Sequence, residues 1–147
     1  MDENPWTLKL GKGVSFVKTH LKRLPRTVDV WQADLQPFPE AEEGRKRRRT
    51  CWLGVVLSLT DDFILADRVL DTPPTVNDLA RLLADGMRRP LIETAHRPSR
   101  LVLRDNPLWQ EILPHLKELK IEVVLQDRLP EWDLMLADFI RDQEKTR

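Results

Sequence analysis

Cysteine and histidine are scarce in this chain of 147 residues. Cys51 is the only cysteine, which excludes an internal disulfide framework and a zinc site built on cysteines. His20, His96 and His115 are scattered, without the spacing of a histidine metal motif. No histidine lies near Cys51 in the sequence, so we interpret Cys51 as a small buried side chain rather than a nucleophile. These absences predict no metal site of the histidine or cysteine kind.

Glycine is also sparse, with five residues in the whole chain. The glycines at positions 11, 13, 44, 54 and 86 form neither a dinucleotide-binding fingerprint nor a phosphate-binding loop. Both of these motifs need closely spaced glycines, because the backbone must approach the phosphates of the ligand. We therefore expect no nucleotide cofactor.

Net charge and long apolar runs are absent as well. Lysine and arginine together number 24, and so do aspartate and glutamate, so the chain lacks the positive charge typical of nucleic-acid-binding domains. No apolar run approaches the roughly 20 residues that cross a membrane. The first residues also lack the apolar core of a signal peptide. These observations favour a cytoplasmic protein with no membrane partner.

The apolar pattern predicts alternating strands and helices. A polar connection over 36–49 follows the first strand, which we expect to stop at Pro37 and Pro39, and Pro114 is expected to kink the helix that contains it. We expect an arm and a short helix over 1–27, an α/β domain over 28–143 and a disordered tail over 144–147. In chain order the predicted elements are a helix in 14–24, a strand in 27–35, a hairpin in 51–70, a helix capped by Thr75, a strand ending at Asp105, a helix capped by Asn106, a strand beginning at Ile121 and a helix in 130–143.

The fold class follows from the order of these elements. The strands that end near Asp105 and Asp127 are separated by a helical segment, which is typical of a right-handed unit with parallel strands. Three strands before a helix, then two more strands separated by helices, is the order of the ribonuclease H-like fold, β-β-β-α-β-α-β-α. By this analogy we expect a single α/β domain with a mixed five-stranded sheet and helices on both faces. The strand of Trp31 would lie at the centre, parallel to the strand that ends at Asp105.

Two short motifs resemble those of an uncharacterised bacterial domain of unknown function. Residues 30–39 match its V-W-x-x-D-x-x-x-x-P opening, and residues 97–105 match its R-P-x-x-(apolar)3-R-D segment. Residues 119–124 and the pair Leu129-Pro130 are similar to its closing strand and the start of its last helix. The resemblance covers about residues 28–142 and implies no assigned activity.

The ribonuclease H-like analogy suggests one catalytic hypothesis, a magnesium-dependent nuclease. Enzymes of this fold hold two Mg²⁺ ions with carboxylates on the first strand, after the fourth strand and on a late helix. Asp34, Asp105 and Glu131 would take these places here, with Asp133 as an alternative to Glu131. Against this, Pro107 stands where such enzymes have glycine.

Each of these acids also has a structural interpretation. Asp105 and Asn106 can cap the helix that begins at Pro107, which we favour. Asp34 can bond to the basic loop or to Arg104. Either interpretation would leave no metal site, and we expect no cofactor unless the nuclease hypothesis holds.

The basic run Arg45-Lys46-Arg47-Arg48-Arg49 is a second candidate site. Five adjacent cations can neutralise several phosphates, which would indicate a nucleic-acid-binding loop. Three glutamates directly before the run offset its charge, no aromatic residue interleaves with it, and such blocks are usually solvated.

We therefore predict a non-catalytic interaction or scaffold module whose partner is a protein. A scaffold should carry an exposed apolar patch, for which the edge of the hairpin is the first place to look. The nuclease and the nucleic-acid-binding module are the alternatives.

Overall fold

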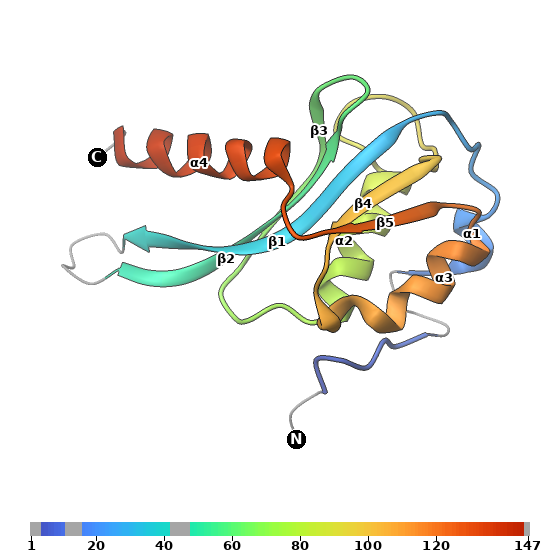
Figure 1. Cartoon of the computed structure of the whole chain (residues 1–147), viewed down its shortest axis with the longest axis horizontal. Helices are drawn as coiled ribbons and strands as arrows, with labels where there is room; N and C mark the ends of the chain where they lie inside the picture. The colour runs from blue at the N-terminus through green and yellow to red at the C-terminus, as the bar shows by residue number, and fades with distance from the viewer. Residues whose placement is uncertain (1–3, 11–15, 42–47, 146–147) are drawn as a thin grey trace.

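A computed structural model describes residues 4–10, 16–41 and 48–145, and it consists of one mixed sheet with helices on both of its faces (Figure 1). The predicted α/β class and the predicted order of elements are confirmed. The strands are β1 Val30–Ala41, β2 Arg48–Ser58, β3 Phe63–Leu70, β4 Arg100–Arg104 and β5 Glu122–Gln126. The helices are α1 Lys18–Leu21, α2 Val76–Arg88, the 3-10 helix η1 Pro107–Ile112, α3 Leu113–Glu118 and α4 Pro130–Lys145.

The five strands lie in the order β3-β2-β1-β4-β5. β1 is antiparallel to β2 and parallel to β4, with Trp31 opposite Ser58 on one side and Leu101 on the other. β5 continues the parallel part of the sheet beyond β4. The prediction that the Trp31 strand lies at the centre, parallel to the strand ending at Asp105, is therefore confirmed.

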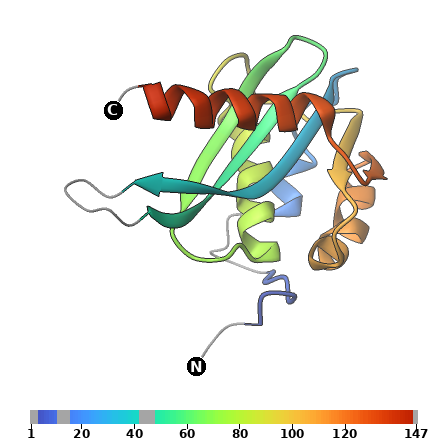
Figure 2. The same cartoon turned by 60° about the vertical axis from the view of Figure 1, so that its left-hand side comes forward.

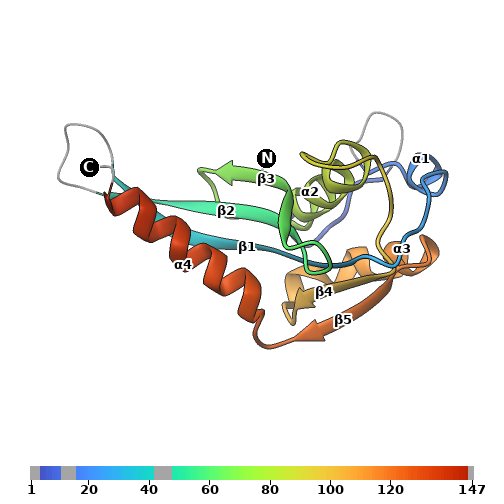
Figure 3. The ribbon, with the colours of Figure 1, turned by 90° about the horizontal axis from the view of Figure 1, so that it is seen from above.

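The two faces of the sheet are covered by different helices (Figure 3). Trp31, Ala33 and Leu35 alternate toward the face of α2 and α3, where they join the larger apolar core. Val30 and Phe38 point to the opposite face, where α4 supplies the rest of a smaller core. α4 crosses that face at an angle to the strands (Figure 2). Asp34 lies on the α4 face, so its carboxylate is placed between the sheet and this helix.

β1 continues through Pro37 and Pro39, where we expected the strand to stop. The N–H of Leu59 donates to the carbonyl of Val30, and the register between β1 and β2 has no break. In an antiparallel pair, every second residue of a strand bonds to its partner strand. Val30 is such a residue, and Pro37 and Pro39 lie an odd number of residues after it, so the nitrogens of both prolines point away from β2. β4 pairs with β1 only as far as Ala33, so neither proline removes a bond from the sheet. The polar connection predicted over 36–49 is therefore wrong at both ends, because residues 36–41 belong to β1 and residues 48–49 belong to β2.

Capping residues account for where the helices begin. The Thr75 side chain accepts from the backbone N–H of Asp78 and the Asp78 carboxylate accepts from the N–H of Thr75, which forms a complete capping box. The Asn106 side chain accepts from the N–H of Leu108 at 3.0 Å, as predicted for the cap of this helix. Pro114 follows the point where the 3-10 helix η1 gives way to α3, so the predicted irregularity is a change of helix type.

Two predicted segments are only partly described. Residues 45–47 of the basic run lie outside the described residues, and of Arg48 and Arg49 only the backbone, within β2, is described. Part of the predicted tail belongs to α4, which extends to Lys145. Within the described ranges, no helix combines the length and apolar character needed to cross a membrane.

Candidate functional site

Asp34, inside β1, and Arg104, the last residue of β4, form an ion pair. Ala33 and Leu103 are register partners in these parallel strands, so the residues that follow them are neighbours on the α4 face. The Arg104 Nε donates to Asp34 Oδ2 at 2.7 Å, and its Nη2 donates to Asp133 Oδ1 of α4 at 2.5 Å. One guanidinium thus links a strand carboxylate to a helix carboxylate.

Burial governs the electrostatics of this ion pair. The Asp34 side chain is fully buried, and this burial raises the pKa of Asp34 although Arg104 and Gln36 donate hydrogen bonds that act in the opposite direction. Burial alone would lower the pKa of Arg104, but the carboxylates of Asp133 and Asp34 raise it above its ordinary value. Arg104 therefore stays cationic and is the charge partner of Asp34.

The three acids of the nuclease hypothesis do not form a common cluster. Asp105 is exposed, and its backbone N–H donates to the carbonyl of Gln126. Glu131 accepts a hydrogen bond from the Gln32 side chain at 2.6 Å. A two-metal site needs carboxylate oxygens that face each other across a cation.

The neighbourhood of Asp34 does not fit a magnesium ion. The Arg104 guanidinium already lies between Asp34 and Asp133, the strand and helix acids of the hypothesis. The interpretation in which Asp34 bonds to Arg104 agrees with this geometry, and no step of metal chemistry follows from these residues.

A groove of about 810 Å³ lies beside α4, between this helix, the β2–β3 hairpin and the segment after α2. Leu91, Ile92 and Leu134 line it and leave 62%, 50% and 63% of their surfaces exposed. Among the described residues that line the groove there is no lysine or arginine. Its acidic lining residues are Asp62, Asp67, Glu131, Asp138 and Asp142. The groove is therefore lined by exposed apolar side chains and by carboxylates, which we call its apolar lining and its acidic rim.

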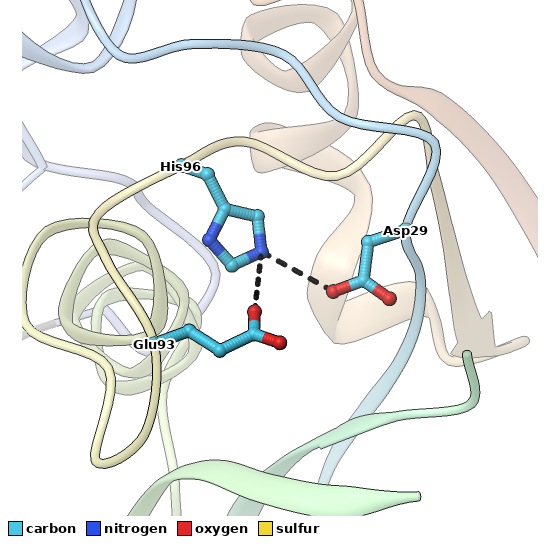
Figure 4. Close-up of side chains that lie close together, drawn as sticks. All are labelled: Asp29, Glu93 and His96. Atoms are coloured by element: carbon cyan, nitrogen blue, oxygen red, sulfur yellow. Dashed lines mark hydrogen bonds and ion pairs between the residues drawn. The ribbon is translucent and has the colours of Figure 1, made fainter. Parts of the chain in front are cut away.

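Asp29, Glu93 and His96 come together at the amino end of β1 (Figure 4). His96 Nε2 lies 3.2 Å from Asp29 Oδ2 and 3.8 Å from Glu93 Oε2. Among the described histidine, cysteine, aspartate and glutamate residues, this is the only group of three whose ligand atoms lie within 4.8 Å of one another. The sequence analysis missed it, because Asp29 is distant in the sequence and the other two lie in a loop.

One solved structure with a similar fold contains a viral assembly. It is the cryo-electron microscopy structure of a simian T-cell lymphotropic virus intasome in complex with the PP2A regulatory subunit B56 gamma. The matched chain of that structure is 14% identical to this chain, with a TM-score of 0.56. The match covers 87% of this chain but only 45% of the other, so the likeness concerns the fold alone.

Comparison of sequences gives the family. No curated protein matches this chain. A family model matches residues 18–140, which include all five strands and most of α4. The resemblance to a domain of unknown function is thereby confirmed, and the chain belongs to the family described as Domain of unknown function (DUF6930).

Proposed function

We propose that this chain is a non-catalytic interaction module that binds a basic amphipathic segment of a partner protein in the groove beside α4. The observation that carries the proposal is the combination of exposed apolar side chains with an acidic rim in one groove. Its position agrees with the expectation that a binding patch lies at the edge of the hairpin, because β3 is an edge strand of the sheet.

The ribonuclease H-like fold is part of this proposal. The sheet order, the central β1 and its parallel neighbour β4 support it. The similarity to the chain of the intasome structure supports a shared architecture, but an identity of 14% carries no argument about activity.

Arg104 favours a binding role over phosphoryl transfer. A guanidinium between Asp34 and Asp133 supplies the positive charge that a metal ion would supply in a nuclease. Unlike a metal ion, it has no open coordination site at which water could be bound and activated, and its N–H groups already donate to Asp34 and Asp133. The fold then serves to hold surfaces in place rather than to activate water.

The cytoplasmic location belongs to the same proposal. Cys51 is the only cysteine of the chain and is buried, and such sparse use of cysteine agrees with a reducing compartment. The groove would then meet its partner inside the cell.

The apolar lining of the groove indicates that the bound segment has an apolar face. Exposed large apolar side chains are costly in water, and three of them gather in this groove. A volume of about 810 Å³ falls in the range of ligand-binding clefts. A helix with apolar side chains at positions i, i+3, i+4 and i+7 would fill such a groove along one face.

The acidic rim of the groove indicates that the bound segment is positively charged. Five carboxylates surround the groove. Asp138 has an exposed ion pair with Arg141 at 3.0 Å, which is weak because both side chains are solvated. Lysine and arginine side chains beside the apolar face of a helix would meet this potential, whereas the phosphates of a nucleic acid would be repelled.

Fluorescence anisotropy with a labelled model peptide tests the proposal. The probe is a peptide of about 16 residues with leucine at helical spacing and lysine elsewhere. Leu134→Ser should weaken binding about tenfold or more, because one buried leucine contributes about 1.5–3 kcal/mol. Leu125→Ser, at the opposite edge of the sheet, is the matched control and should leave the Kd unchanged.

Two comparisons decide the outcome. A peptide in which glutamate replaces lysine should bind far more weakly than the basic one, since the rim is acidic. Equal binding of both peptides, or equal loss in Leu134→Ser and Leu125→Ser, would refute the proposal. Self-association of the wild type that Leu134→Ser abolishes would also refute it, because the occupant would then be a second copy of this chain.

A further inference from the structure

We infer that Asp29, Glu93 and His96 form a binding site for a divalent transition-metal ion, with Zn²⁺ as the probe of choice. The site lies at the amino end of β1, away from the Asp34–Arg104 pair at its carboxyl side and independent of the peptide-binding proposal. The three residues supply one imidazole nitrogen and two carboxylate groups (Figure 4). Mixed nitrogen and oxygen ligands of this kind suit Zn²⁺ better than Mg²⁺, which prefers oxygen alone.

The hydrogen bonds of His96 aim its Nε2 at the carboxylates. Nδ1 lies 2.8 Å from the carbonyl oxygen of Thr94, which can only accept, so Nδ1 carries a proton. Nε2 lies within hydrogen-bond distance of Asp29 Oδ2, at 3.2 Å, and 3.8 Å from Glu93 Oε2. A metal ion would take the place of a proton on Nε2 and bind this nitrogen together with the two carboxylates. A backbone carbonyl bound to the other ring nitrogen is the usual support of a metal-binding histidine.

The distances suit coordination. Zn²⁺ binds imidazole nitrogen and carboxylate oxygen at about 2.0–2.2 Å, so neighbouring ligand atoms of a tetrahedral site lie about 3.2–3.6 Å apart. The Nε2 of His96 lies 3.2 Å from Asp29 Oδ2 and 3.8 Å from Glu93 Oε2. All three ligand atoms lie within 4.8 Å of one another, so a modest closure of the cluster would bring them onto one ion.

Neighbouring side chains hold the ligands in place. Trp31 Nε1 donates to Asp29 Oδ2 at 2.8 Å, and Ser58 Oγ donates to Asp29 Oδ1 at 2.8 Å. The Trp31 ring also packs edge-on against the His96 ring, with centroids 5.4 Å apart. Asp29 and His96 are each 4% exposed, so their positions change little when an ion enters.

The surroundings are acidic and open to the outside. A cavity of about 230 Å³ borders the three ligands, and the carboxylate of Asp61 lines it as well. Burial, followed by the hydrogen bond and the charge of Asp61, raises the pKa of Glu93. A divalent cation would relieve this crowding of negative charge. Asp61 or a water molecule in the cavity would be available as a further ligand.

Glu93 also adopts a backbone conformation that glycine would adopt more easily. Its φ is 78°, in the left-handed region that L-residues rarely occupy. A glycine here would relieve this strain, so a glutamate in this conformation costs the fold some stability. This makes Glu93→Gly an informative variant, because it separates stability of the fold from binding of the ion.

Thermal unfolding of chelator-treated protein with added Zn²⁺ tests the inference. Zn²⁺ should raise the Tm of the wild type and bind once per chain by calorimetry, while the same concentration of Mg²⁺ should have little effect. Glu93→Gln should lose most of the Zn²⁺-dependent rise in Tm. Glu93→Gly should have a higher Tm than the wild type without metal and should also lose the rise.

Glu122→Gln is the control, because this exposed glutamate on β5 lies outside the cluster. It should keep the full effect of Zn²⁺. An unchanged Tm of the wild type with Zn²⁺ would overturn the inference and leave His96 as a buried hydrogen-bond partner of Asp29. A rise of equal size in wild type, Glu93→Gln and Glu93→Gly would overturn it too, since the ion would then bind elsewhere.

Discussion

Two substitutions at the Asp34–Arg104 pair should have very different effects on stability. Arg104→Met removes the charge that faces Asp34 and keeps an apolar stem of similar length. Asp34 is fully buried, so its carboxylate would then be left without a cation. Asp34→Asn removes the buried negative charge instead and leaves Arg104 paired with Asp133.

The expected magnitudes follow from burial. Breaking a buried ion pair from one side costs about 3–5 kcal/mol, because a charge remains in a poorly polar site. We therefore expect Arg104→Met to lower the free energy of unfolding by about 3–5 kcal/mol. Asp34→Asn should change it by less than about 1 kcal/mol, since the cost of burying an ionised Asp34 offsets most of the attraction to Arg104.

Urea unfolding at neutral pH measures both values. Arg100→Met is the matched control, because Arg100 lies on the same strand and pairs with Glu122 at the surface, where both side chains are about half exposed. An exposed pair of this kind contributes less than about 1 kcal/mol. If Asp34→Asn destabilised the protein as much as Arg104→Met, the buried pair would be a net stabilising unit and the reasoning would fail.

The pH dependence gives an independent check on the same pair. Burial raises the folded-state pKa of Asp34 above its unfolded value. The folded protein therefore binds the proton of the Asp34 carboxyl group more tightly than the unfolded chain does. As the pH rises from the unfolded-state pKa to the folded-state pKa of Asp34, the loss of this proton lowers the free energy of unfolding. Relative to Asp34→Asn, the wild type should lose stability as the pH rises above the ordinary pKa of an aspartate, about 3.9. A relative gain over that range would contradict the assigned pKa direction.

Two further predictions concern the α2 face of the sheet. Thr75→Ala removes the capping box of α2 and should lower the free energy of unfolding by about 1 kcal/mol in urea titrations, whereas Thr72→Ala, just before it in an exposed position, should have no effect. Gly54→Ala would place a Cβ 2.7 Å from Leu35 Cδ2, and both this leucine and the nearby Leu82 are buried, so we expect a loss of about 1–3 kcal/mol. Gly86 lies inside α2, and a Cβ there would meet Val56 of β2 at an ordinary contact distance of 3.4 Å. Because alanine favours a helix more than glycine does, Gly86→Ala should raise the free energy of unfolding by about 0.5–1 kcal/mol. A loss of stability equal to that of Gly54→Ala would refute the packing argument.

The sheet was predictable because its strands carry a strong apolar signal. Trp31, Ala33 and Leu35 alternate with polar residues, and this alternation correctly assigned each to its face. The length of β1 was not predictable from the same rule. Pro37 and Pro39 ordinarily end a strand, and only the early end of β4 leaves their nitrogens facing an open side. That fact depends on tertiary pairing, which no local pattern contains.

The sites divide in a similar way. A pairing of Asp34 with Arg104 could be considered from the sequence, because the two residues lie on strands that the order of elements makes adjacent and parallel. The cluster at His96 could not. Its partner Asp29 is 67 residues away, and the loop that carries His96 has no periodicity to orient a side chain. Spacing rules for metal ligands find sites on one helix or hairpin, whereas this cluster depends on how a loop crosses the end of the sheet.

The two proposed sites have different lining residues, but these residues are adjacent in two loops. Asp62, Leu91 and Ile92 line the groove beside α4, and the adjacent residues Asp61 and Glu93 border the metal cavity. An ion that holds Asp61 or Glu93 would fix the backbone of both loops, and those loops also form one side of the groove. Any change in peptide affinity caused by the ion must then be matched by an equal factor in the affinity for the ion when peptide is bound. Binding of an ion at Asp29, Glu93 and His96 would in this way change the affinity of the groove beside α4 for a partner protein. No reaction at the Asp34–Arg104 pair is needed for this effect.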